Sequence, residues 1–69
     1  MKIAFYERLK DLRLEKEMSQ DQLAKATGLS QKGISQWESQ KRIPNAIVVV
    51  TLALYFGVSA DYILGITND

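Results

Sequence analysis

The chain has 69 residues, of which 46% are hydrophobic and 25% are charged, and its net charge is +1. This length and composition predict one soluble globular domain over residues 1–69 and argue against a disordered chain or a membrane protein. Because cysteine and histidine are absent, disulfides, thiolate or imidazole catalysis and the usual zinc ligands are excluded, and we expect no metal, no cofactor and no enzymatic activity.

The first predicted helix spans about residues 5–16. Phe5, Leu9 and Leu12 recur at helical spacing, and charged residues fill the other faces. The same charges interrupt residues 1–12, which therefore lack the apolar stretch of a signal peptide or a membrane helix. We accordingly expect a cytoplasmic protein without a membrane partner.

A second helix is predicted from Gln20 to Gly28. Ser19 is a candidate N-cap, Gln22 stands where its side chain reaches back to that cap, and the flanking apolar residues fit a hydrophobic staple. Gly28 suits the left-handed conformation that ends a helix.

The same start signal returns at once and predicts a third helix from Gln31. Ser30 is the candidate cap, and Leu29 and Ile34 are the apolar pair around it. Only residues 28–30 separate the two helices, and so short a turn makes them cross steeply. The segment of about residues 20–38 is therefore predicted to be a helix-turn-helix.

Two further helices complete a predicted all-α, five-helix domain. Pro44 and Asn45 open the fourth, which ends before Gly57, and Ser59 caps the fifth, which ends at Gly65. The β-branched run 47–51 could be a buried strand, but a lone strand would have nothing to pair with. The expected core residues are Leu23, Ala24, Leu29, Ile34, Trp37, Leu52 and Phe56, with Ala46, Val49 and Ala53 completing the inner face of the fourth helix.

Charge is unevenly distributed along these elements. Residues 19–42 carry four basic and two acidic side chains, whereas residues 43–69 carry no basic and two acidic ones. A local basic surplus suits docking on phosphate groups, although a solvated helix face would have the same composition.

A spaced motif covers most of the chain. It reads Ser19-Gln20-x-x-Leu23-Ala24-x-x-x-Gly28-Leu29-Ser30-x-x-x-Ile34-Ser35-x-Trp37-Glu38, followed by Pro44 and Gly57-Val58-Ser59. With this motif the chain resembles the lambda-repressor and Cro type of helix-turn-helix domain, found in phage repressors and bacterial regulators. The resemblance implies that the third helix enters the major groove of double-stranded DNA while the second lies across the backbone.

The resemblance also implies residue roles. The base-reading positions fall on Gln31, Lys32 and Gln36, whose side chains suit adenine and guanine edges. Contacts to the DNA backbone are expected from Gln20, Ser30, Ser35, Lys41 and Arg42. Simple solvation is the alternative for these polar side chains, and capping is the alternative for Ser30.

Other positions have structural interpretations. In the resembling family the residues matching Arg13 and Glu38 form an ion pair between the first and third helices, and we expect that pair here. Glu17 and Gln40 stand where the family favours Gly or Asn, so those helix ends are expected to close by another geometry. Gly33 inside the third helix either permits close approach to the DNA surface or is simply a poor helix former.

The fourth helix carries a second apolar stripe beyond its core face. We interpret this stripe as a two-fold dimer interface, joined by residues of the fifth helix; its expected members are Ile47, Val50, Thr51, Leu54, Tyr55, Tyr62 and Ile66.

Several functions fit this sequence. The leading one is a transcriptional regulator, a repressor, that binds an inverted repeat as a homodimer with half-sites about 34–36 Å apart. An antitoxin-like regulator would use the apolar stripe to hold a partner protein, and a protein-interaction module would not use the base-reading residues. An enzyme is the least favoured class, because the carboxylates, lysines and tyrosines show no recognisable pairing.

Overall fold

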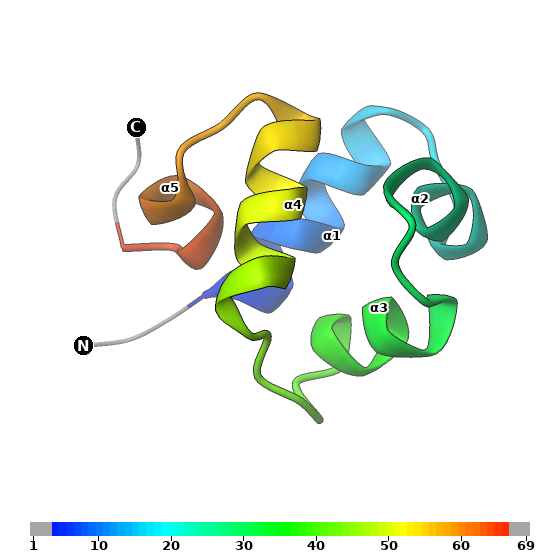
Figure 1. Ribbon diagram of the computed structural model, residues 1–69, viewed down its shortest axis with the longest axis horizontal. Helices are drawn as coiled ribbons and strands as arrows, with labels where there is room; N and C mark the ends of the chain where they lie inside the picture. Colours follow the sequence, from blue (N-terminus) through cyan, green and yellow to red (C-terminus); the bar gives the residue numbers. More distant parts are fainter. Residues whose placement is uncertain (1–3, 67–69) are drawn as a thin grey trace.

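The computed structural model describes residues 4–66, which form five α-helices and no strand (Figure 1). Their bounds are α1 Phe5–Glu15, α2 Gln20–Thr27, α3 Gln31–Glu38, α4 Ala46–Phe56 and α5 Ala60–Leu64. The all-α prediction is confirmed, and the β-branched run lies within α4. Within these residues no helix is long and apolar enough to cross a membrane.

Short polar side chains start four of the five helices. Ser19, Ser30, Asn45 and Ser59 each accept a hydrogen bond from the backbone N–H three residues further on, at 2.9–3.0 Å. At Ser19 the capping box is complete, since the side chain of Gln22 also accepts from the Ser19 N–H at 2.8 Å. The predicted starts of α2 to α5 are therefore confirmed, and each rests on a local hydrogen bond.

The ends of α1 and α3 correct one prediction. Glu17 and Gln40 adopt the left-handed conformation usually taken by glycine, with φ of 53° and 64°. After α3, the Lys41 N–H donates to the Gln36 carbonyl at 2.8 Å and the Gln40 N–H donates to the Trp37 carbonyl at 3.2 Å. This is a Schellman motif, and the same pattern closes α1. The expectation of another geometry was wrong, because the paired hydrogen bonds offset the strain of a side chain there.

Glu17→Gly is therefore expected to stabilise the domain. A left-handed residue with a side chain costs about 1–2 kcal/mol, while glycine adds unfolded-state entropy of about 0.5–1 kcal/mol. The balance predicts a gain of about 0.5–1 kcal/mol, or about 2–8 °C in Tm for a domain of this size. Thermal unfolding followed by circular dichroism measures it. Glu17→Ala, which keeps the strain, is the control, and equal Tm values for the two variants would contradict the assignment.

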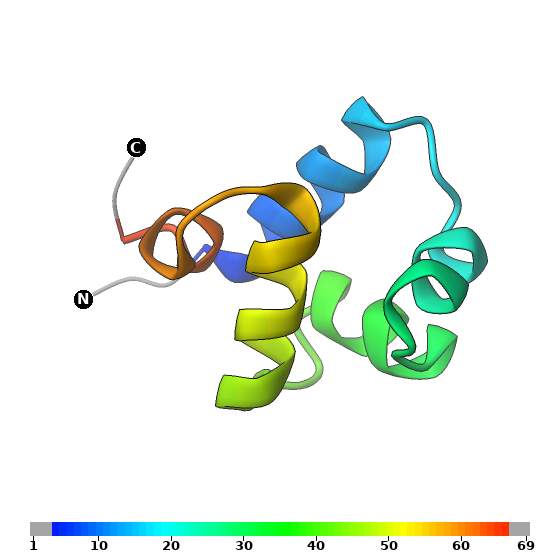
Figure 2. The ribbon, with the colours of Figure 1, turned by 45° about the horizontal axis from the view of Figure 1, so that its top comes forward.

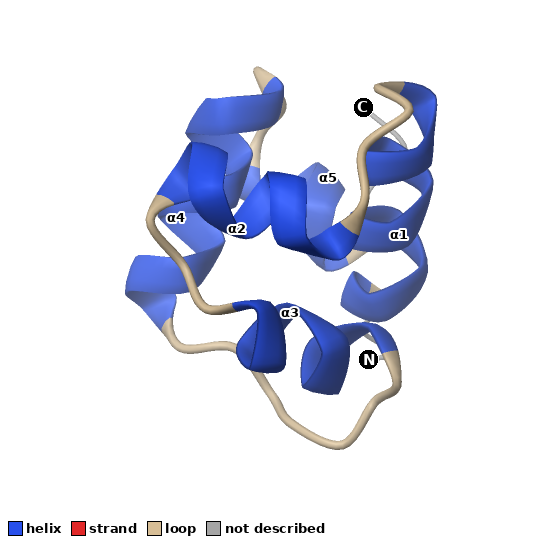
Figure 3. Cartoon of the chain, turned by 90° about the vertical axis from the view of Figure 1, so that its right-hand side faces the viewer, coloured by secondary structure: helices blue, strands red, loops and turns tan. Residues whose placement is uncertain are grey.

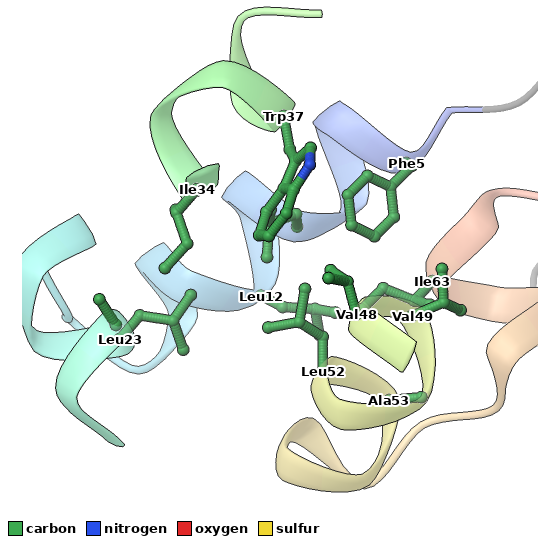
Figure 4. Close-up of a cluster of buried hydrophobic side chains, with 12 residues drawn as sticks. Phe5, Leu12, Leu23, Ile34, Trp37, Val48, Val49, Leu52, Ala53 and Ile63 are labelled. Atoms are coloured by element: carbon green, nitrogen blue, oxygen red, sulfur yellow. The ribbon is translucent and has the colours of Figure 1, made fainter. Parts of the chain in front are cut away.

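The core is assembled from all five helices (Figure 4). Leu9, Leu23, Ile34, Leu52 and Ile63 are fully buried. The ring of Phe5 meets that of Trp37 edge to face, with centroids 6.5 Å apart, an arrangement that aromatic pairs favour. These contacts fix α3 against α1 and so determine which side of α3 faces outward.

Three core expectations need correction. Ala46 is exposed, and Val48 takes the inner position in the first turn of α4. At 3.6 residues per turn these two positions lie nearly opposite each other on the helix, and Val48 is the one aligned with Leu52. Leu29 and Phe56 are only partly buried and pack against the edge of the core.

Candidate nucleic-acid interface

The connection between α2 and α3 is short and well bonded. Gly28 is left-handed, with φ of 79°, and its N–H donates to the Ala24 carbonyl at 2.9 Å. The Thr27 hydroxyl donates to the Leu23 carbonyl at 2.8 Å and accepts from the Leu29 N–H at 3.3 Å. The two helices consequently cross on one side of the molecule, with α3 at its edge (Figures 2 and 3).

Opposite faces of α3 have opposite environments. Gly33, Ile34 and Trp37 are buried against the domain. On the outer face Gln31, Lys32 and Ser35 are exposed and Gln36 is half-buried. We call this set of four residues the reading face. It unites the three residues expected to read bases and one expected to contact the backbone.

The other expected backbone contacts flank the reading face at different places. Ser30 caps α3 by accepting from the Gly33 N–H at 2.9 Å, so its capping role is present in the structure. Gln20, the first residue of α2, donates its side-chain amide to Glu38 at 3.2 Å. Lys41 and Arg42 are exposed in the loop that follows α3.

The predicted ion pair between Arg13 and Glu38 anchors α3 from behind. Arg13 Nε and Nη2 donate to the two carboxylate oxygens of Glu38 at 2.8 and 2.9 Å, and Nη1 donates to the Met18 carbonyl at 2.7 Å. The side chains are only 10% and 6% exposed. The hydrogen bond to Glu38 raises the pKa of Arg13 above its ordinary value, so the guanidinium stays charged. With the Gln20 amide, the pair joins α1, α2 and α3.

These ion pairs also shape the charge of the interface. Glu38 is bound to Arg13, and Asp21 is bound to Lys25 at 3.1 Å. They are the two acidic residues of segment 19–42. Within residues 4–66 no carboxylate forms a salt bridge with the three remaining cations of that segment, Lys32, Lys41 and Arg42. The uncompensated positive charge of this segment therefore lies on the reading face and the adjoining loop.

Gly33 faces the protein interior rather than the reading face. A Cβ atom there would lie 2.8 Å from the Ser30 hydroxyl oxygen and 3.2 Å from the ring of Trp37. The suggested close approach to DNA is wrong, because the space that glycine leaves is filled from within the domain. The residue allows the Ser30 cap and the Trp37 ring to pack close to the α3 backbone.

The exposed apolar surface around α4 differs in part from the one predicted from the sequence. Ile47, Val50 and Leu54 on α4 are 75%, 52% and 77% exposed, and Ile43 in the preceding loop is 88% exposed. We call these four residues the apolar stripe. Ile43 was missed from the sequence because it precedes the helix and so falls outside its periodicity.

The remaining expected dimer residues lie around or apart from the stripe. Thr51 is half-buried, and its hydroxyl donates to the Ile47 carbonyl at 2.8 Å. Tyr55 and Tyr62 are half-buried under cations, Lys16 at 5.6 Å and Arg8 at 4.3 Å from the ring centroids. Ile66, after α5, is 45% exposed. The two tyrosines thus pack within the domain, where cation–π contacts hold their rings.

Comparison with solved structures defines the class. The P22 c2 repressor, crystallised in complex with a synthetic operator, has a TM-score of 0.80 and 33% identity, covering 87% of this chain and 91% of that one. A transcriptional regulator from Listeria innocua has a TM-score of 0.87 at 23% identity, covering 100% of this chain and 64% of that one, and shares the fold. The fold is that of a lambda-repressor-like helix-turn-helix domain.

Sequence comparison gives the family. The chain belongs to the helix-turn-helix family, whose model matches residues 9–63. It is 34% identical over 65 residues to the transcriptional regulator YobD of Bacillus subtilis and 38% identical over 60 residues to the transcriptional activator BcrR of Enterococcus faecalis. The matches cover 94% and 87% of this chain, but only 58% of YobD and 29% of BcrR.

Proposed function

We propose that the domain recognises a specific sequence of double-stranded DNA by placing α3 in the major groove. The observation that carries this proposal is the reading face: polar side chains project from α3 on the side opposite its buried residues, beside uncompensated cations. Glutamine can pair with an adenine edge and lysine can donate to guanine, each good bidentate pair discriminating by about 1–3 kcal/mol. The P22 c2 repressor, which has the same fold, was crystallised with an operator.

Contacts to the DNA backbone would fix the register of α3. Gln20 and Ser30 stand at helix starts, where backbone N–H groups favour a phosphate. Ser35, Lys41 and Arg42 are exposed on or next to the reading face and can contact phosphates directly. The hydroxyl oxygen of Ser30 accepts from Gly33, which leaves its hydrogen available for such a contact.

Selection of bound duplexes from a random library tests this proposal. The expected result is enrichment of one site, palindromic, with half-sites about 34–36 Å apart. A chain that is folded and enriches no sequence would overturn sequence-specific recognition.

We propose further that the protein acts as a homodimer on this site, joined through the apolar stripe. The stripe begins with Ile43 in the loop that leaves α3 and continues with Ile47 in the first turn of α4, so pairing through it can bring two reading faces to the same side of the dimer. Residues 43–60 carry no charged side chain that pairing would bury. The domain measures 30 × 24 × 20 Å, so two copies in contact are large enough to place their α3 helices in successive major grooves, about 34–36 Å apart.

Ile47→Glu is expected to separate this dimer. Two carboxylates would face each other across the two-fold axis, whereas a glutamate in the first turn of α4 favours the helix itself. Sedimentation should give twice 7.8 kDa for the unchanged chain and 7.8 kDa for the variant, with affinity for the palindrome lowered by about 100-fold or more. Leu14→Glu, at a 51% exposed apolar residue of α1, is the matched control. Equal masses for Ile47→Glu and the unchanged chain would contradict this interface.

The regulatory outcome we propose is repression, because a bound dimer blocks its site by occupancy alone. A second candidate follows from the exposure of the apolar stripe: an antitoxin-like regulator would cover the stripe with a different protein. A monomer that persists at micromolar concentration and on DNA would favour this second candidate.

A further inference from the structure

We propose that Arg42 is a positioning residue that orients the side-chain amide of Gln36 for base reading. This role rests on the proposed recognition of DNA and differs from the simple phosphate contact expected for Arg42. In the structure Arg42 Nη1 donates to Gln36 Oε1 at 3.3 Å. Within the described residues, Gln36 is the one reading-face residue whose side chain accepts or donates a hydrogen bond.

The backbone brings Arg42 back to Gln36. The left-handed residue Gln40 reverses the chain after α3, and the Gln36 carbonyl accepts from both the Lys41 N–H at 2.8 Å and the Ser39 hydroxyl at 3.2 Å. Side chain and carbonyl of Gln36 are therefore both held by the loop of residues 39–42. Gln31, Lys32 and Ser35 are exposed and have no such support.

The chemistry of arginine decides which end of the amide is held. A guanidinium has donors and no acceptor, so it must bind the oxygen of the amide and not the nitrogen. The two N–H donors of Gln36 then remain for DNA. Donors suit the N7 and O6 acceptors of guanine and clash with the exposed amino group of cytosine. Without Arg42 the amide can turn over and present its oxygen, which accepts from amino groups.

If Arg42 orients the Gln36 amide, the unchanged chain should have a narrower base preference than Arg42→Met at the position that Gln36 reads. Removing the guanidinium in Arg42→Met should lower discrimination at the position read by Gln36 by about 3–10-fold, the range of one hydrogen bond. That position is identified experimentally as the one where Gln36→Ala loses base preference. In the Gln36→Ala background Arg42→Met should change no base preference further, because the amide it orients is gone.

Selection from a random duplex library, at one fixed salt concentration, compares these variants with the unchanged chain. Lys41→Met is the matched control, since it removes the neighbouring cation and should weaken all sequences alike. If Arg42→Met also weakens all sequences alike, the positioning role is overturned while DNA recognition stands. If the unchanged chain enriches no sequence, DNA recognition and this role fall together.

A second measurement needs no DNA. In nuclear magnetic resonance spectra of the free domain, Arg42→Met should shift the side-chain amide signals of Gln36, and Lys41→Met should leave them in place. Gln40→Gly keeps the left-handed turn and should also leave them in place. Unchanged Gln36 signals in Arg42→Met would overturn the positioning role whatever the outcome with DNA.

Discussion

Glu38→Ala is expected to leave the domain largely unfolded at ordinary temperature. The substitution strands the Arg13 guanidinium at a site where its side chain is 10% exposed, with the Met18 carbonyl as its remaining partner. Breaking a buried pair in this way costs about 3–5 kcal/mol. A domain of this size rarely has more than about 3–5 kcal/mol of stability from its core. Urea unfolding, followed by the fluorescence of Trp37 and by circular dichroism, measures the loss.

Two comparisons isolate the cause of this loss. Asp21→Ala breaks a pair whose side chains are 53% and 79% exposed, and should cost less than about 1 kcal/mol because water screens it. Replacing both buried partners, as Arg13→Met with Glu38→Leu, should recover much of the stability, since no charge is then left unpaired. A loss below about 1 kcal/mol for Glu38→Ala would show that water reaches Arg13 and that the pair is not structural.

The helix starts could be predicted from the sequence because their signals are local. Each cap is one side chain bonded to a backbone group three residues away, so Ser19, Ser30 and Ser59 identify α2, α3 and α5 without tertiary information. The left-handed conformation of Glu17 has no such local cap. The family's preference for Gly or Asn at this position indicates it, but a glutamate alone does not, because the conformation depends on the Schellman hydrogen bonds of the folded chain.

The wrong assignment of Ala46 to the core also arose because the sequence gives no local signal for the inner residue. The apolar content of α4 is nearly continuous, so hydrophobicity did not distinguish Ala46 from Val48 as the inner residue. Ala46 is the first residue of α4, where the core covers Val48 but leaves Ala46 exposed. The cation–π contacts of Tyr55 and Tyr62 could not be predicted either, because Lys16 and Arg8 lie on or next to α1, far away in the sequence. The interface role of the two tyrosines stays a prediction.

The candidate site likewise has one part that could be predicted from the sequence and one part that could not. That Gln31, Lys32 and Gln36 share an outward face follows from helical spacing once Ile34 and Trp37 are buried. The contact between Arg42 and Gln36 does not follow, because it requires a left-handed glutamine between them.

Replacing Gln31, Lys32 and Gln36 together by alanine is expected to abolish sequence preference while the fold persists. These side chains fill no part of the core, and alanine is the better helix former. Specific sites are typically bound about 10³-fold or more tighter than unrelated DNA. The variant should therefore bind the selected palindrome as weakly as a scrambled duplex, with the remaining affinity steeply salt-dependent through Lys41 and Arg42. Fluorescence anisotropy with both duplexes at one salt concentration measures the ratio.

The control for this variant removes one lysine charge, as the triple variant does, but at a position outside the reading face. Lys16 follows α1 and contacts the ring of Tyr55, which belongs to α4, so it is not part of the reading face. Lys16→Ala should therefore retain the full preference for the palindrome. Circular dichroism and the urea midpoint of the triple variant should match those of the unchanged chain or exceed them, which separates lost recognition from lost folding. A folded triple variant that still prefers the palindrome would place base reading outside α3. The apolar stripe would then be the better candidate for the binding surface, since its four exposed side chains do not belong to α3.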